Sequence, residues 1–304
     1  MLRIIVSRLL QGVAVMIGAT LIVFLASYLT GDPAALMMGD TATPEQIEEF
    51  RALRGLDRPW YILYAEFLVD LVQGDLGTSI YYNQPNASLI LQRLPATLKL
   101  AAAALGLALV LAIPLGVLAA LKRGTWIDTV VTSLAVAGQS MPNFWLAIMM
   151  IFYFGVSKGW LPVSGSEGLE CLIMPCITLM MLPLAQNMRM MRSAMLEVLG
   201  DEYIKLARSK GLRDMVVTWK HTLKNAIRPV ITQVGLQMGS FLGGAVITET
   251  IFSWPGIGRL SVTAITMHDF PLLQAIAAMI ALIFVVINLS VDLVYALLDP
   301  RVRN

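Results

Sequence analysis

Residues 100–121 read LAAAALGLALVLAIPLGVLAAL, a run of 22 residues without a charged side chain. An α-helix rises about 1.5 Å per residue, so a run of this length matches the roughly 30 Å hydrocarbon core of a bilayer. Six uncharged windows of similar length occur in the chain, at residues 9–31, 100–121, 129–157, 171–188, 229–248 and 270–291. The sequence therefore predicts an all-α, polytopic membrane protein with six transmembrane helices.

The composition excludes the common alternatives to this fold. Of the 304 residues, 57% are hydrophobic and only 14% are charged, whereas soluble globular domains contain about 25% charged residues. One apolar window could form a buried core helix, but six in one chain exceed what a soluble core can cover. A membrane β-barrel would instead show short segments of alternating hydrophobicity.

The distribution of Lys and Arg predicts the orientation. With the N-terminus in the cytoplasm, 15 of the 22 basic residues fall on the inner side, where short basic loops are retained. The outer segment 32–93 then carries nine acidic and four basic residues, and the inner segment 189–228 carries four acidic and nine basic residues. We therefore expect both termini in the cytoplasm.

The windows divide the chain into four parts. We expect a cytoplasmic N-terminus with the first span at 1–31, an extracytoplasmic helical loop at 32–97, a five-helix core at 98–298 that includes the inner loop 189–228, and a cytoplasmic C-terminus at 299–304.

The outer loop has helix signals of its own. Thr43-Pro44-Glu45-Gln46 is typical of a capped helix start, and Gly55 is a candidate end. A second, amphipathic helix is expected between Pro59 and Gly74, with a face formed by Trp60, Tyr61, Tyr64, Phe67 and Leu68. Aromatic side chains favour the membrane interface, so this helix either lies along the membrane surface or packs on the bundle as a lid.

Glycine and proline predict how the spans pack. Gly235, Gly239 and Gly243 leave bare backbone on one face of the fifth span, where a helix of this chain or of a partner can approach closely. Prolines within or beside spans are Pro114, Pro142, Pro175 and Pro183. Each removes a helix hydrogen bond, which favours kinked helices around a cavity.

The inner loop 189–228 contains a helix–turn–helix pattern. Asp201 is placed as the N-cap of a helix, and Gly211 follows as a residue able to adopt the positive φ that ends a helix. A second helical stretch is expected from near Asp214 to near Pro229, where the fifth span begins. The first helix extends through Lys210, its predicted face comprises Tyr203, Leu206, Ala207 and Lys210, and the apolar contact after the turn is Leu212.

Three functions compete for this basic and apolar loop. Contact with anionic lipid headgroups explains the Lys and Arg residues but not the apolar face or the glycine turn. DNA binding by a helix-turn-helix is disfavoured because the loop is tethered to the membrane on both sides. Docking of a short helix into a groove of a cytoplasmic protein explains the cap, the apolar face and the turn together.

Residues 202–212 read EYIKLARSKGL and residues 221–229 read HTLKNAIRP. These segments resemble the ATPase-coupling loop of ABC importer permeases of the dipeptide, oligopeptide and nickel class. Further matching pieces, in chain order, are GDP at 31–33, GLDRP at 55–59, GDLG at 74–77, ETIFSWPG at 249–256 and LDPR at 298–301. Together they cover nearly the whole chain. The general importer signature begins Glu-Ala-Ala, whereas this chain has Glu202-Tyr203-Ile204.

The resemblance implies the first of two permease chains of an ATP-driven importer in the bacterial inner membrane. The implied partners are a second homologous permease, two cytoplasmic ABC ATPase subunits, an extracytoplasmic substrate-binding protein and membrane lipid, without nucleic acid. Peptides are the implied substrate, and nickel complexes, glutathione, opines or oligosaccharides are alternatives within the class. The implied ATPase-coupling residues are Asp201, Glu202, Tyr203, Leu206, Ala207, Lys210, Gly211 and Leu212.

We expect a non-catalytic subunit with no cofactor or metal site of its own. The chain has no Gly-x-x-x-x-Gly-Lys-Ser/Thr phosphate loop, so partner ATPases would use the ATP and Mg. An ion-coupled secondary transporter would place ionisable groups within the spans, where only Glu249 and Asp292 approach the ends. An intramembrane enzyme would need catalytic residues at a spacing that the spans lack. Polar candidates for the pathway are Gln139, Ser140, Asn143, Gln186, Asn187 and Asn288.

Overall fold

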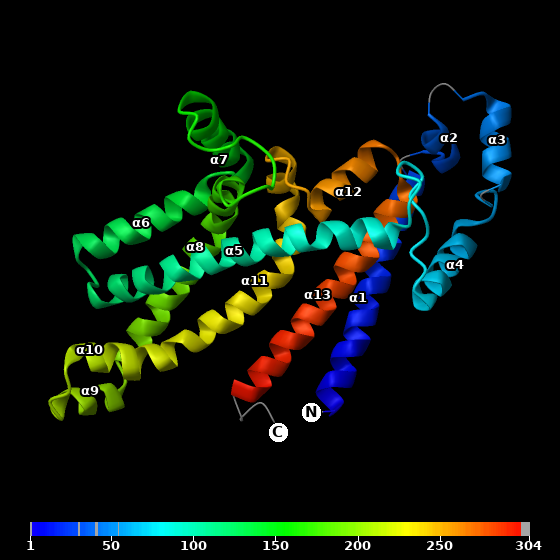
Figure 1. The fold of residues 1–304 in the computed structure, drawn as a ribbon. Coiled ribbons are helices and arrows are strands. Elements are labelled where there is room, and N and C mark those ends of the chain that lie inside the picture. Colours follow the sequence, from blue (N-terminus) through cyan, green and yellow to red (C-terminus); the bar gives the residue numbers. More distant parts are fainter. Residues whose placement is uncertain (1, 30, 40–41, 54, 299–304) are drawn as a thin grey trace. The chain divides into compact units, whose positions relative to one another are not determined.

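The computed structural model describes residues 2–29, 31–39, 42–53 and 55–298, with the backbone alone at residues 2–9, 240, 242–244 and 292–298. The regular secondary structure of these residues is helical (Figure 1), which confirms the all-α prediction. In chain order the helices are α1 (Leu2–Leu29), α2 (Pro33–Met38), α3 (Pro44–Leu53), α4 (Trp60–Gln73), α5 (Asn86–Leu121), α6 (Trp126–Ser140), α7 (Asn143–Met150), η1 (Ile151–Ser157), α8 (Glu170–Leu199), α9 (Glu202–Ser209), α10 (Asp214–Val216), η2 (Val217–Thr222), α11 (Leu223–Ile251), α12 (Ile257–Thr266) and α13 (Phe270–Leu298).

Long apolar helices account for the predicted spans. Among the described residues, four helices have the length and hydropathy to cross a membrane, at Leu10–Leu29, Asn86–Leu121, Glu170–Leu199 and Phe270–Val291. The bent pair formed by α6 and by α7 with η1 is a fifth candidate. α11 covers the window predicted for the remaining span, at 229–248.

Pro142 breaks the third span, as the proline pattern predicts. α6 ends at Ser140, α7 begins at Asn143, and the two arms of the pair are bent by 95°. A proline disfavours the helical conformation of the residue before it, and Met141 is accordingly extended, with φ −77° and ψ 128°. The third span is therefore two helices joined at an angle.

The expected boundary at Pro229 is wrong. α11 runs without interruption from Leu223 to Ile251 and contains Pro229 in its interior. A proline removes one helix hydrogen bond, and a membrane helix can remain continuous where its neighbours satisfy the freed carbonyl. The second loop helix and the fifth span therefore form one continuous element instead of two.

The described chain divides into two compact units. The first comprises the residues up to Thr97 together with Pro255–Leu289, and the second comprises Leu98–Trp254 and the residues from Ser290 onward. In the first unit, the start of α5 packs with α12 and α13 around an apolar core. This core contains Leu89, Ile90, Ile257, Leu260, Ala264, Leu272, Ala275 and Ile276.

The outer helices of the first unit begin and end where the sequence predicts. At the start of α3, the Thr43 N–H donates to Gln46 Oε1 at 2.9 Å and the Gln46 N–H donates to Thr43 Oγ1 at 3.3 Å. Gly55 follows α3 with φ +64°, and Gly74 ends α4 in the left-handed conformation. The reciprocal bonds satisfy two backbone donors that a helix start otherwise leaves unpaired.

α4 packs against α1 through Tyr64. The Tyr64 side chain is buried, and its hydroxyl donates to the Ile17 carbonyl oxygen at 2.8 Å. Its ring also lies 5.3 Å from the ring of Phe24, centroid to centroid. Trp60 and Tyr61 remain exposed. These contacts favour the lid arrangement over a helix held by the membrane surface alone.

In the second unit, α8 packs along both α6 and α11. The core between α5, α8 and α11 contains Val117, Ala120, Met191, Ala194, Met195, Ala226 and Val230. Gly116 allows the close approach of α5, because a Cβ atom there would lie 2.7 Å from the Met188 carbonyl oxygen. α8 is therefore the central helix of this unit.

A bidentate ion pair fastens α6 to α8. Arg192 donates from Nε and Nη2 to the two carboxylate oxygens of Asp128, each at 2.7 Å. The Gly124 N–H donates to the same carboxylate at 3.1 Å. The Asp128 side chain is only 9% exposed and that of Arg192 26%, so water screens the pair weakly.

We expect Asp128→Asn to lower the free energy of unfolding by about 2 kcal/mol, because it leaves a partly buried guanidinium without its counter-charge. Thermal unfolding of the purified protein in detergent measures this change. The matched control is Asp214→Asn, since Asp214 is 89% exposed and lies 3.7 Å from Arg208, a geometry worth less than about 1 kcal/mol. Equal losses in the two variants would contradict a stabilising role for the buried pair.

Candidate functional site: the loop between α8 and α11

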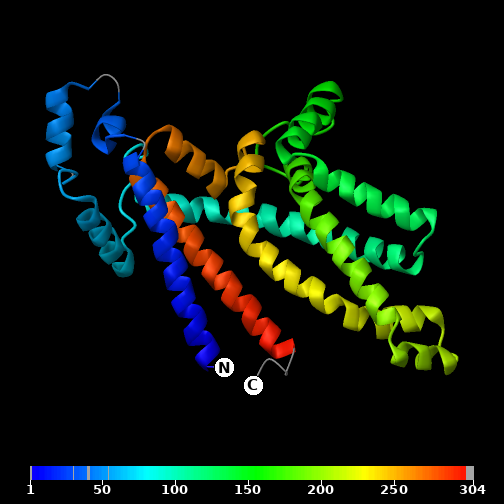
Figure 2. The same cartoon turned by 180° about the vertical axis from the view of Figure 1, so that it is seen from behind.

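The chain between α8 and α11 folds as a compact helix–turn–helix. α9 follows the end of α8, and α10 with η2 leads directly into α11. Figures 1 and 2 show α9 and α10 next to each other, at the end of α8 and the start of α11. The predicted order of helix, glycine turn and helix is therefore confirmed.

One buried side chain anchors α9. Ile204 is fully buried, where α9 packs against η2 and the end of α8. Leu206, on the opposite side of the helix, is 56% exposed. Tyr203 is also exposed, and its hydroxyl accepts a hydrogen bond from Asn225 Nδ2 at 2.7 Å. Sequence reasoning missed Ile204, although a large apolar residue outside the predicted face is the signal of a second, buried contact.

α9 starts at the predicted residue but lacks the side-chain capping hydrogen bond that an N-cap aspartate is expected to make. Asp201 precedes the helix in an extended conformation, as an N-cap does, but its side chain makes no capping hydrogen bond. Its backbone carbonyl accepts from the Ile204 and Lys205 N–H groups at 3.2 and 3.3 Å. Glu202 places a negative charge in the first turn, where the helix dipole favours it.

Gly211 ends α9 in a left-handed conformation, with φ +76°. The Gly211 N–H donates to the Arg208 carbonyl at 2.9 Å and the Leu212 N–H donates to the Ala207 carbonyl at 3.4 Å, which is the Schellman pattern of a helix end. A Cβ atom on Gly211 would meet nothing within 4 Å. The backbone conformation, and not lack of space, therefore requires glycine here.

The loop exposes a set of large apolar side chains, which we call the docking face: Tyr203, Leu206, Leu212, Met215, Val216 and Trp219. Val217 and Thr222 of η2 are buried and hold the second helix in place. Exposed basic residues in the same loop are Lys205, Arg208, Lys210, Arg213 and Lys220. Grouped apolar exposure within a polar rim marks an interaction surface. A partner with an apolar groove and acidic edges would complement it.

Gly235, one of the three glycines predicted to share a face of α11, packs against a helix of the same chain. A Cβ atom on Gly235 would overlap the Val291 side chain of α13. Gly239 is buried, and the surroundings of Gly243 lie outside the described residues. At Gly235, therefore, the close approach is made by a helix of the same chain.

Some of the predicted pathway residues are brought together. Asn143 and Gln186 line one cleft of about 190 Å³ with Gln237, which sequence reasoning did not single out. Asn187 is fully buried beside them and donates from Nδ2 to Gln237 Oε1 at 2.7 Å. A pairing of amides on α8 and α11 is visible only once the register of these two helices is known.

The other predicted pathway residues have local partners. Gln139 accepts a hydrogen bond from Arg189, and the Ser140 hydroxyl donates to the Val136 carbonyl in its own helix at 2.8 Å. Asn288 lies in the first unit and donates to the carbonyl of Phe284 at 2.8 Å.

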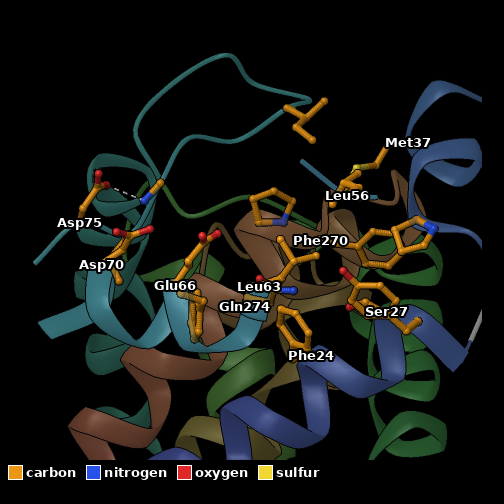
Figure 3. A pocket seen from close by; sticks show the side chains of 17 residues that line it. Phe24, Ser27, Met37, Leu56, Leu63, Glu66, Asp70, Asp75, Phe270 and Gln274 are labelled. Atoms are coloured by element: carbon orange, nitrogen blue, oxygen red, sulfur yellow. Dashed lines mark hydrogen bonds between the residues drawn. The ribbon is translucent and has the colours of Figure 1, made fainter. Parts of the chain in front are cut away.

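A larger cavity of about 290 Å³ lies in the first unit among α1, α4 and the start of α13. Figure 3 shows Glu66, Asp70 and Asp75 on one side of it. Asp75 Oδ1 accepts from the Gly77 N–H at 2.8 Å, and Glu66 is paired with Arg58. Three of the nine acidic residues of the outer segment 32–93 therefore line this cavity.

Two family comparisons cover almost the entire chain. Residues 112–304 match the family described as "Binding-protein-dependent transport system inner membrane component". Residues 1–101 match the corresponding N-terminal family, "Binding-prot-dependent transport system membrane comp, N-term".

Curated relatives match over their full length. The chain is 40% identical to the dipeptide transport system permease protein DppB of Alkalihalophilus pseudofirmus, over 97% of this chain and 98% of the relative. It is 39% identical to the di/tripeptide transport system permease protein DppB of Pseudomonas aeruginosa and 38% identical to the dipeptide transport system permease protein DppB of Escherichia coli K12, each over 100% of this chain and 99% of the relative.

Solved structures share the fold at lower sequence identity. A chain of the MetNI methionine ABC transporter in an inward-facing conformation matches with a TM-score of 0.57 and 17% identity, over 70% of this chain and 97% of that chain. A chain of an amino acid ABC transporter crystallised with histidines matches with a TM-score of 0.50 and 18% identity, over 71% of this chain and 94% of that chain.

We expect Ile204→Ala to detach α9, because truncation of a fully buried isoleucine costs about 2–5 kcal/mol. Trypsin cleavage after Lys205 and Arg208 should then be at least about tenfold faster than in the unaltered protein, since cleavage follows the population of the opened loop. Leu206→Ala is the control, because truncation of an exposed side chain changes stability by less than about 0.5 kcal/mol. Similar cleavage rates in the two variants would rule out Ile204 as the anchor.

Proposed function

This chain belongs to the family of inner membrane components of binding-protein-dependent transport systems, and from that membership we propose that it is the permease subunit of an ATP-driven peptide importer. It is an integral protein of the inner membrane. In this proposal it forms half of a translocation pathway, together with a second homologous permease. The observation that carries the proposal is identity of about 40% to dipeptide permeases across the full length of both chains.

Peptides are the substrate class that the relatives support. The relatives from three different bacteria are each named for dipeptide or di/tripeptide transport. Nickel complexes, glutathione, opines and oligosaccharides, which the wider class also includes, find no comparable support among these relatives. We therefore assign short peptides as the cargo.

We propose that the docking face binds a cytoplasmic ABC ATPase. The chain has no phosphate-binding loop of its own, so in this proposal ATP is hydrolysed by another subunit. α9 is anchored by Ile204 and packs on the end of α8 and on η2, which continues into α11. A displacement of the docking face by ATP-driven closure of the ATPases would therefore be passed directly to two spanning helices.

The remaining parts of the proposal concern topology and assembly. The Lys and Arg distribution supports cytoplasmic N- and C-termini and a cytoplasmic docking face. Two ATPase subunits would then lie on the inner side, one for each permease, and a substrate-binding protein on the outer side. The family description itself names dependence on a binding protein.

Dipeptide uptake into proteoliposomes that contain the assembled complex tests the proposal. We expect uptake to require ATP and the loaded binding protein, and to continue when a protonophore collapses the proton gradient. The control is the same complex with a non-hydrolysable ATP analogue, which should give no uptake. Uptake that persists without ATP but stops with the protonophore would identify an ion-coupled secondary transporter instead.

We expect Gly211→Val to uncouple transport from ATP hydrolysis. A β-branched residue is strained at φ +76°, so the end of α9 and Leu212 would shift on the ATPase. The measurement is the number of peptides imported per ATP hydrolysed, which should fall at least about fivefold. Gly211→Asn is the matched control, because asparagine tolerates the left-handed conformation. Full coupling in the Val variant would show that coupling does not require glycine at this turn.

A further inference from the structure

Among the described residues, the side chains that line the cleft of the second unit are uncharged. Its lining comprises Asn143, Leu179, Leu182, Pro183, Gln186, Gln237 and Phe241. Gln186 and Gln237 lie near the middle of α8 (Glu170–Leu199) and of α11 (Leu223–Ile251). The cleft therefore offers hydrogen-bonding groups between two predicted spans, and lipid offers none.

Three amide side chains form a hydrogen-bonded series that leads into this cleft. Asn187 Nδ2 donates to Gln237 Oε1 at 2.7 Å, and Gln237 Nε2 donates to Gln186 Oε1 at 2.9 Å. Hydrogen bonds in series polarise one another, so the Nε2 group of Gln186 is a strengthened donor at the cleft. No described residue accepts from it.

The buried end of the series is incomplete as well. Asn187 is fully buried, yet its Oδ1 atom has no hydrogen-bond partner among the described residues. Buried polar atoms in proteins are nearly always paired, and the exceptions call for an explanation. Asn187 Nδ2 also donates to the Pro183 carbonyl at 2.8 Å, which fixes the orientation of this amide, so the series presents its donor end at Gln186.

Backbone groups add to the polarity of the cleft. Pro183 has no N–H group, so the Leu179 carbonyl, one turn earlier in α8, lacks its usual helix partner. The break at Pro142 makes Asn143 the first residue of α7, and no side chain caps the N–H groups of that first turn. Leu179 and Asn143 both line the cleft, so its lining residues carry a carbonyl without a helix partner and N–H groups without a side-chain cap, the two functions that a peptide group itself carries.

We propose that this cleft is a subsite for the backbone of the transported peptide. Gln186 Nε2 and the side-chain amide of Asn143 would donate to peptide carbonyl oxygens. This inference rests on the proposed function and deepens it. Peptides of different sequence share only their backbone, so a path that serves many of them has to recognise peptide groups. Neutral amides do this without selecting the charge of the peptide side chains.

The test measures the maximal uptake rate in proteoliposomes that contain the complete complex, at saturating loaded binding protein. The probes are dialanine and dileucine, which share a backbone and differ in side-chain bulk. We expect Gln186→Leu and Asn143→Leu each to slow both peptides by the same factor, about three- to tenfold, as for the loss of one neutral hydrogen bond. Gln92→Leu makes the same chemical change on an exposed amide of the first unit, outside the cleft, and should transport both peptides like the unaltered complex.

The outcomes separate the subsite from the proposed function. Rates within twofold of the unaltered complex for both cleft variants, or a loss for one dipeptide alone, would overturn the subsite while peptide import stands. Failure of the unaltered complex to import either dipeptide would overturn the proposed function and the subsite with it. If Gln186→Leu does not assemble with the ATPase subunits, Asn143→Leu decides the question, because Asn143 makes no hydrogen bond that holds α8 to α11.

Discussion

A bilayer offers no water to a backbone N–H or C=O group, and this constraint decides which helices of the chain stay continuous and which one breaks. α5, α8 and α11 run unbroken through Pro114, Pro183 and Pro229. Among the described helices, only the third span turns sharply, at Pro142, and both of its arms contact α8. Irregular backbone at membrane depth is tolerated where protein surrounds it. The break and the polar cleft beside it therefore both depend on packing against α8.

The fold follows from the sequence wherever a local rule is sufficient. Uncharged windows of bilayer length predict the spans, and the pairing of Thr43 with Gln46 predicts the start of α3. The boundary at Pro229 fails for a physical reason. A proline is a local signal to end a helix, but α8 packs along α11, and a helix supported by a neighbour can include a proline in its interior.

The candidate site is predictable in outline and not in detail. The helix–glycine–helix pattern of the loop is visible in the residues, because Gly211 and the periodic apolar face of α9 are local features. Which apolar residue is buried is not a local property. Ile204 and Leu206 are similar side chains two positions apart, and only the packing of α9 on η2 and α8 makes one an anchor and leaves the other exposed. Gln237 was missed for the same reason, since its partners lie on another helix.

The same two helices connect the docking face with the cleft. α8 ends at the loop and α11 begins from it, and the hydrogen bond between Gln237 and Gln186 joins these helices near their middles. The Asp128–Arg192 pair fastens α6 to α8 in turn, so a shift of α8 also moves the first arm of the broken span. A displacement that alters the spacing of α8 and α11 must stretch or break the amide series, because a hydrogen bond weakens steeply beyond about 3.2 Å. A displacement of the loop and the hydrogen-bonding capacity of the cleft are therefore mechanically linked through one pair of helices.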